Sequence, residues 1–100
     1  MLVVLPTYTR LTTLRLVLES LCHAELPDNE ELRLLVVSNK PDNADRVESL
    51  IREVYEVRPL LSQNWELIFY HRKKTIDPIE NWYGAINAHA KEGEIVFLHG

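Results

Sequence analysis

The sequence predicts an α/β fold in three layers, in which a mostly parallel sheet carries helices on its faces in the order β-α-β-α-β-α-β. Two observations carry this prediction. Apolar runs rich in Leu, Ile and Val alternate with segments whose apolar residues recur every three or four positions. Each apolar run also ends in a polar loop, as strands do at the ligand-binding edge of a parallel sheet. The chain is long enough for one domain, residues 1–100.

The first strand and helix are expected within residues 2–24. An apolar strand at residues 2–5 stops at the loop 6–10, and a helix then runs to about residue 24. Leu16 points away from the apolar side of this helix. The stripe that faces the sheet consists of Leu11, Leu14, Leu18 and Leu21.

The second strand is expected at residues 32–37, followed by the polar loop 38–41. Asp42 or Asn43 can cap the next helix, which ends at residues 58–59, where an Arg-Pro pair stands. The apolar positions of this helix are Val47, Leu50, Ile51 and Val54.

The third strand is expected at residues 65–70, and Asp77 caps the next helix. Proline at the first helical position and Glu80, placed to complete a capping box, strengthen this start. Gly93 closes the helix, and a fourth strand covers residues 94–98. The expected buried face consists of Ile79, Trp82, Tyr83, Ile86 and Ala90.

Composition excludes several classes of protein. With 15 acidic and 11 basic residues, the net charge is −4, which argues against a nucleic-acid partner. No apolar run reaches the roughly 20 residues of a membrane span, and no signal peptide precedes the first strand, so we expect a cytoplasmic protein. Cys22 is the only cysteine, which excludes an internal disulfide and a Cys-rich zinc site. Three scattered glycines form neither a dinucleotide fingerprint nor a phosphate loop.

Polar loops at the ends of the strands are expected to meet at one edge of the sheet. There an aromatic ring can stack on a base, hydroxyl and amide groups can read a base edge or a ribose, and cations can neutralise phosphates. We interpret the charged run 72–74 as solvated, and the residues suggest no catalytic group. The candidate nucleotide-binding residues are Pro6, Thr7, Tyr8, Arg10, Ser38, Asn39 and His99.

Several segments together resemble family 2 glycosyltransferases of the GT-A fold. The opening residues 2–10, Leu-Val-Val-Leu-Pro-Thr-Tyr-Thr-Arg, are similar to the first strand and loop of that family. Residues 35–39 stand where the family has its second strand and an acid-containing loop. Asn81-Trp82 and residues 93–98 resemble the segment that leads to the family's Asp-x-Asp motif. The resemblance covers essentially all 100 residues and implies the N-terminal, nucleotide-sugar-binding half of a Rossmann-like GT-A domain.

The resemblance also implies roles for the loop residues. Pro6, Thr7 and Tyr8 would contact the base, and Ser38 and Asn39 would lie at the base or ribose. The activity implied is transfer of a sugar from a nucleotide-diphosphate sugar to an acceptor hydroxyl.

In that family the Asp-x-Asp motif holds a divalent cation, Mn or Mg, but here the fourth strand runs into His99 and Gly100. The metal ligands are therefore not present in this chain, and neither is the general base of the family's second half. We expect a truncated enzyme that is inactive by itself.

Two other interpretations stay open. The same edge could belong to a non-catalytic α/β module that binds a nucleotide or a protein. An open edge of the sheet could also lead to self-association.

Overall fold

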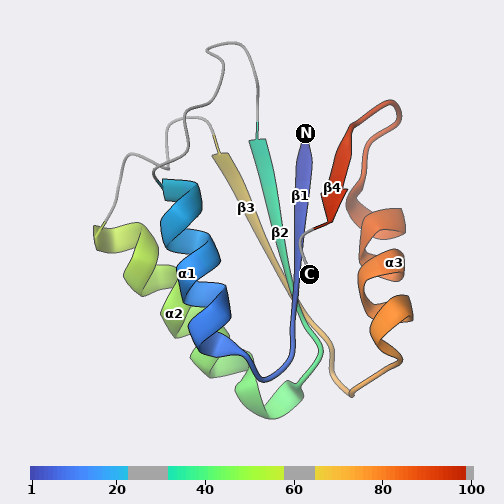
Figure 1. The fold of residues 1–100 in the computed structure, drawn as a ribbon. Helices are drawn as coiled ribbons and strands as arrows, with labels where there is room; N and C mark the ends of the chain where they lie inside the picture. The colour runs from blue at the N-terminus through green and yellow to red at the C-terminus, as the bar shows by residue number, and fades with distance from the viewer. Residues whose placement is uncertain (23–31, 58–64, 99–100) are drawn as a thin grey trace.

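A computed structural model of the protein describes residues 1–22, 32–57 and 65–98. The order of the elements confirms the predicted α/β fold class (Figure 1). They are β1 (Leu2–Thr7), α1 (Leu11–Cys22), β2 (Leu32–Ser38), the short 3-10 helix η1 (Pro41–Asn43), α2 (Ala44–Val57), β3 (Trp65–His71), α3 (Pro78–His89) and β4 (Val96–Leu98).

The four strands form one parallel sheet in the order β3-β2-β1-β4. Helices α1 and α2 lie together on one face and α3 lies on the other, which gives the three layers that the sequence predicts (Figure 1). The chain first runs outward from β1 through β2 to β3, and then crosses back to place β4 on the other side of β1. The direction in which strands are added to the sheet therefore reverses between β1 and β4. Ligands of open α/β sheets bind beyond the carboxyl ends of the strands, next to such a reversal.

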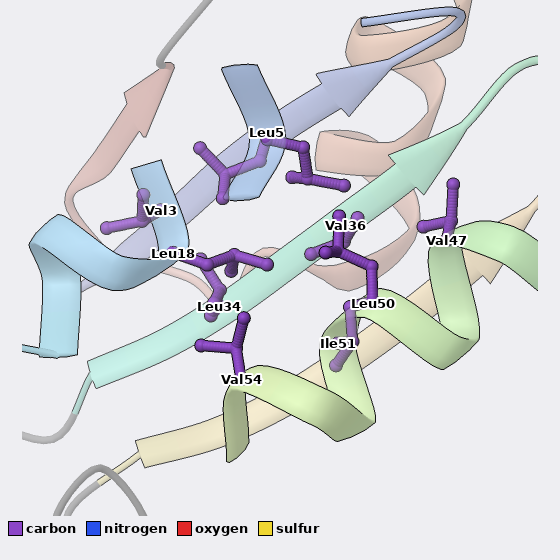
Figure 2. Packing of buried hydrophobic residues seen from close by; sticks show 10 residues of the cluster. Val3, Leu5, Leu18, Leu34, Val36, Val47, Leu50, Ile51 and Val54 are labelled. Carbon is purple, nitrogen blue, oxygen red and sulfur yellow. The ribbon is translucent and has the colours of Figure 1, made fainter. Parts of the chain in front are cut away.

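The larger core lies between the sheet and helices α1 and α2 (Figure 2). The apolar positions expected for α2 are all buried, and so are the two central leucines of the α1 stripe. Leu16 is 60% exposed, as expected for the opposite side of α1. The buried members of this cluster are Val3, Leu5, Leu14, Leu18, Leu34, Val36, Val47, Leu50, Ile51 and Val54.

The smaller core lies under α3, and here the predicted helix face is partly wrong. Ile79 and Tyr83 are 64% and 58% exposed, whereas Asn81 and Ala85 are buried against the sheet. The strands already fill this face with leucine and valine side chains, so α3 approaches through a small side chain and a hydrogen-bonded amide. The buried members of this cluster are Leu2, Val4, Leu35, Val37 and Ala85.

The structure confirms the predicted start of α3 but not its predicted end. Oδ1 of Asp77 accepts hydrogen bonds from the backbone amides of Ile79 and Glu80 at 2.9 and 3.3 Å, which confirms the cap. The helix ends at His89 instead of Gly93, because Ala90 already has an extended backbone. Gly93 lies in the turn between α3 and β4, with a φ of 75°.

One boundary near the start of the chain also differs from the prediction. Strand β1 continues to Thr7, two residues beyond the expected end. Pro6 fits within it because the described pairing of β1 with β4 stops at Val4, so no ladder hydrogen bond from Pro6 to β4 is required. The side chain of Asn43 donates to the carbonyl oxygen of Tyr8 at 3.1 Å, and thus joins the loop after β1 to the start of α2.

Strand β4 pairs with β1 over three residues, and apolar side chains next to its outer edge are exposed. Ile95, Phe97 and Leu98 are 72%, 55% and 39% exposed. Self-association through this edge stays a prediction. None of the helices in the described ranges combines the length and the apolar character needed to cross a membrane.

Candidate functional site

The carboxyl ends of the first three strands meet at one edge of the sheet. The backbone amide of Asn39 donates to the carbonyl oxygen of Thr7 at 2.9 Å, and the amide of Arg72 donates to that of Ser38 at 2.8 Å. Helix α3 also starts at this edge, where Asp77 caps it (Figure 1). The loops after β1 and β2 therefore lie side by side, as expected. His99, the remaining candidate, lies outside the described residues.

A pocket of about 400 Å³ opens at this edge, between the end of β1 and the first turns of α3. Its walls come from three stretches of the chain that are far apart in sequence, so the fold must form before the pocket exists. Two aromatic rings and two side-chain amides line it, which suits a flat, polar ligand. Its lining includes Pro6, Thr7, Tyr8, Asn39, Asn81 and Trp82.

Tyr8 gives this pocket an accessible aromatic ring. The residue is 49% exposed, and Nζ of Lys40 lies 5.6 Å from the centre of its ring. The carbonyl oxygen of Tyr8 accepts the hydrogen bond from Asn43, which fixes the loop although the ring itself is half open. A cation and an aromatic ring thus stand together at the rim of the pocket.

Asn39 lies in the wall of the pocket with both of its side-chain polar groups in use. Nδ2 donates to the carbonyl oxygen of Ile76 at 2.8 Å, and Oδ1 accepts from the amide of Ile76 at 3.0 Å. The residue is 5% exposed. The family resemblance implies contact with a base or ribose, whereas the geometry gives this side chain the task of holding the segment before α3.

Thr7 and Ser38 are register partners at the ends of β1 and β2. Their exposed fractions are 7% and 0%, and neither hydroxyl has a hydrogen-bond partner within the described part of the chain. Thr7 lines the pocket, while Ser38 is sealed inside the protein. Thr7 is therefore the better placed of these two candidates to meet a ligand.

Arg10 lies on the other side of the loop between β1 and α1. It is exposed and lines a second hollow of about 390 Å³ at the start of α1, together with Thr9 and Thr13. Pro6, Thr7 and Tyr8 border both hollows. The structure thus brings four of the predicted residues, Pro6, Thr7, Tyr8 and Asn39, into the pocket beside α3, while Arg10 lines the second hollow.

The interpretation of Arg72 as part of a solvated run is wrong. Its guanidinium lies 4.7 Å from the centre of the Tyr70 ring, and its Nε donates to Oδ1 of Asn81 at 3.0 Å. Nη2 donates to the backbone carbonyl oxygen of Asn81 at 2.9 Å. A Cβ on Gly84 would lie 3.3 Å from Nη2, so the glycine leaves room for the guanidinium. Lys73 and Lys74 are exposed, as expected for solvated charges.

The sequence patterns predict neither the position of Asn81 in the pocket nor its hydrogen bonds with Arg72. The isolated glycine in the middle of a helical pattern is the signal that could have indicated a close neighbour there. It does not identify that neighbour, because nine positions separate Arg72 from Asn81 and only Asn81 belongs to α3.

The family resemblance implies a divalent cation. Residues 1–22, 32–57 and 65–98 contain no cluster of side chains that fits one. Nowhere in these ranges do three His, Cys, Asp or Glu side chains gather as a metal site requires.

Comparisons with models of protein families, with curated proteins and with solved structures gave no significant match.

Proposed function

We propose that the pocket at the carboxyl edge of the sheet binds the nucleotide of a nucleotide-diphosphate sugar, and that this chain is the donor-binding part of a glycosyltransferase of the GT-A type. The observation that supports it best is the position of Tyr8. Its half-exposed ring borders a pocket of about 400 Å³ beyond the end of a central parallel strand, where α/β proteins bind nucleotides.

The chemistry of the pocket supports a base as its occupant. An aromatic ring offers a surface for stacking, worth about 1–3 kcal/mol per base in proteins that bind single strands. Trp82 provides a second ring in the same pocket, and Asn81 provides a side-chain amide. Such a combination of rings and a few polar groups binds flat heterocycles well.

Cations near the pocket support a diphosphate next to the base. Lys40 lies beside the ring of Tyr8, and Lys73 and Lys74 come after β3 at the same edge. Phosphate oxygens would be neutralised there by lysine ammonium groups.

The proposed reaction transfers the sugar to an acceptor hydroxyl. The acceptor oxygen bonds to the anomeric carbon, the bond from that carbon to the diphosphate breaks, and the hydroxyl proton passes to a base. The similarity of residues 2–10 to family 2 glycosyltransferases supports this activity. To this chain the proposal assigns donor binding and none of the bond-breaking steps.

Binding is tested by titrating the protein with uridine, guanosine and adenosine diphosphates in the presence of Mn²⁺ and recording the melting temperature. We expect the uridine or guanosine diphosphate to raise Tm more than the adenosine diphosphate. Tyr8→Ala should reduce the shift, because the ring that stacks on the base is lost. Phe97→Ala is the matched control, since this aromatic residue is 55% exposed on β4 and does not line the pocket. Equal shifts for all three nucleotides, or none, would contradict the proposal.

The alternative is a non-catalytic module that binds its ligand in the same pocket but transfers no sugar. The codons after Gly100 separate the two: aspartates there would favour the transferase, and a stop codon would favour the module.

A further inference from the structure

We propose that the side-chain amide of Asn81, held in one orientation by Arg72, is a hydrogen-bond donor in the pocket that selects a base with a carbonyl at C4 of a pyrimidine or C6 of a purine over one with an amino group at that position. This inference rests on the proposed function and specifies its ligand: a base of the uracil or guanine kind, in preference to cytosine or adenine.

The orientation of the amide is set by the chemistry of arginine. A guanidinium has only donors, so the atom of Asn81 that lies 3.0 Å from Nε of Arg72 must be the oxygen. The NH₂ group is therefore on the other side of the amide. Turning the amide over would place N–H groups against N–H groups and lose this hydrogen bond.

Arg72 is itself held in place, which makes the orientation of the amide rigid. Its guanidinium stacks on Tyr70 and donates from Nη1 to the Tyr70 hydroxyl at 3.2 Å. Nη2 donates to the backbone carbonyl oxygen of Asn81 at 2.9 Å, in the space that Gly84 leaves. A donor fixed before the ligand arrives costs little entropy on binding.

The NH₂ group of Asn81 is available to a ligand. Asn81 is 2% exposed and lines the pocket, and its Nδ2 forms no hydrogen bond with any described residue. An acceptor on the ligand, placed opposite Nδ2, would pair with this donor and replace a hydrogen bond to water.

A fixed donor discriminates between bases. The carbonyl oxygen O4 of uracil accepts a hydrogen bond, whereas the amino group at the same position of cytosine can only donate. Two donors facing each other leave both unpaired and buried, so the amino base is disfavoured. Uridine and cytidine diphosphates are otherwise alike in ribose and phosphates, which makes them the probes of choice.

The test compares the Kd of uridine diphosphate with that of cytidine diphosphate by calorimetry. We expect the unmodified protein to bind the uridine compound about tenfold more tightly, the effect of one hydrogen bond of about 1.4 kcal/mol. Asn81→Asp keeps an acceptor for Arg72 and replaces the NH₂ group by a second oxygen, so the preference should disappear or reverse. Asn87→Asp is the matched control, because Asn87 is exposed on the same helix.

The outcomes separate this inference from the proposed function. Equal affinity for the two nucleotides in the unmodified protein, or an unchanged ratio in Asn81→Asp, would overturn the role of Asn81 and leave nucleotide binding standing. Failure of both nucleotides to bind would overturn the proposed function itself. In the unmodified protein, the side-chain NH₂ resonances of Asn81 should also shift when uridine diphosphate is added. A stationary signal in the presence of bound nucleotide would contradict the inference even if the variant failed to fold.

Discussion

The side-chain amide of Asn39 pairs with the backbone of Ile76 through two hydrogen bonds, of 2.8 and 3.0 Å. The pairing joins the end of β2 to a segment 37 positions later in the sequence, just before α3. The side-chain amide thus donates to and accepts from the backbone of Ile76, as the backbone of a neighbouring strand would. One wall of the pocket therefore depends on a single asparagine for its position.

We expect Asn39→Asp to destabilise the fold by about 2 kcal/mol. A carboxylate cannot donate to the carbonyl oxygen of Ile76, so two acceptors would face each other in a nearly buried place. Urea unfolding monitored by circular dichroism measures the loss. The same change at the exposed Asn87 should leave the unfolding midpoint almost unaltered. If the two variants unfold alike, the pairing contributes nothing to stability.

A buried ion pair stabilises the end of the sheet opposite the pocket, near the start of β2. Nη1 of Arg33, on β2, lies 2.7 Å from Oε1 of Glu94, and the side chains are 10% and 9% exposed. Nη1 also donates to the carbonyl oxygen of His89 at 3.0 Å, and Oε1 accepts from the amide of Lys91 at 3.0 Å. The pair thus connects the central strand β2 to the turn between α3 and β4.

Glu94→Gln should lower the free energy of unfolding by about 2 kcal/mol, because it removes the buried countercharge of Arg33 and leaves the guanidinium with Glu66, whose side chain is 63% exposed. Glu53→Gln provides the comparison. Glu53 also lies 2.7 Å from an arginine, Arg15, but its side chain is 59% exposed, so its loss should have little measurable effect. Equal effects of the two substitutions would show that burial does not set the strength of these pairs.

The same ion pair predicts how stability depends on pH. Burial alone raises the pKa of Glu94, but the hydrogen bond from Lys91 and the charge of Arg33 outweigh it and bring the pKa below the ordinary value of 4.5. The ionised form is therefore favoured by folding. Its contribution is complete above pH 4.5 and is lost as the pH falls through the lower pKa of the folded protein. As the pH falls below 4.5, the urea midpoints of the unmodified protein and of Glu94→Gln should approach each other. A constant difference between the two midpoints would contradict the lowered pKa of Glu94.

Two leucines on α1 test the arrangement of the larger core. Leu18 is 1% exposed and Leu16 is 60% exposed. Leu18→Ala should cost about 2–5 kcal/mol, since it removes buried surface and leaves a cavity, while Leu16→Ala should be nearly neutral. Thermal unfolding of the two variants decides the point. A large loss at Leu16 would mean that another surface covers this side of α1.

Local patterns in the sequence are sufficient to predict the framework. The four apolar runs form the four strands, and the regular leucines and valines of α1 and α2 form the larger core, because these patterns depend on near neighbours in the chain. The predicted face of α3 is partly wrong for the opposite reason. Ile79 and Tyr83 are exposed, whereas the rest of that face packs against the smaller core as expected, namely Trp82, Ile86 and Ala90. The buried side of the helix also includes Asn81, whose burial depends on Arg72 from outside the helix. No periodicity in α3 reveals such a partner.

The candidate site can be predicted only to the level of its loops. The position of Tyr8 beyond a buried strand is a consequence of the topology of a parallel sheet. Whether a polar side chain such as Asn39 faces a ligand or the backbone depends on a contact with Ile76, which is distant in sequence. The sequence therefore indicates where to look, and the contacts decide which side chains remain free.

Arg72→Lys tests the contact that the sequence does not predict. A lysine ammonium cannot donate in one plane to Oδ1 and the backbone oxygen of Asn81 while it also covers the ring of Tyr70. We expect a loss of about 2 kcal/mol in urea unfolding, together with a weaker preference for uridine over cytidine diphosphate as the Asn81 amide becomes free to turn. Arg52→Lys is the matched control, because Arg52 is 71% exposed and pairs with Glu48 alone among the described residues. Unchanged stability and unchanged preference in Arg72→Lys would show that the guanidinium does not hold the amide.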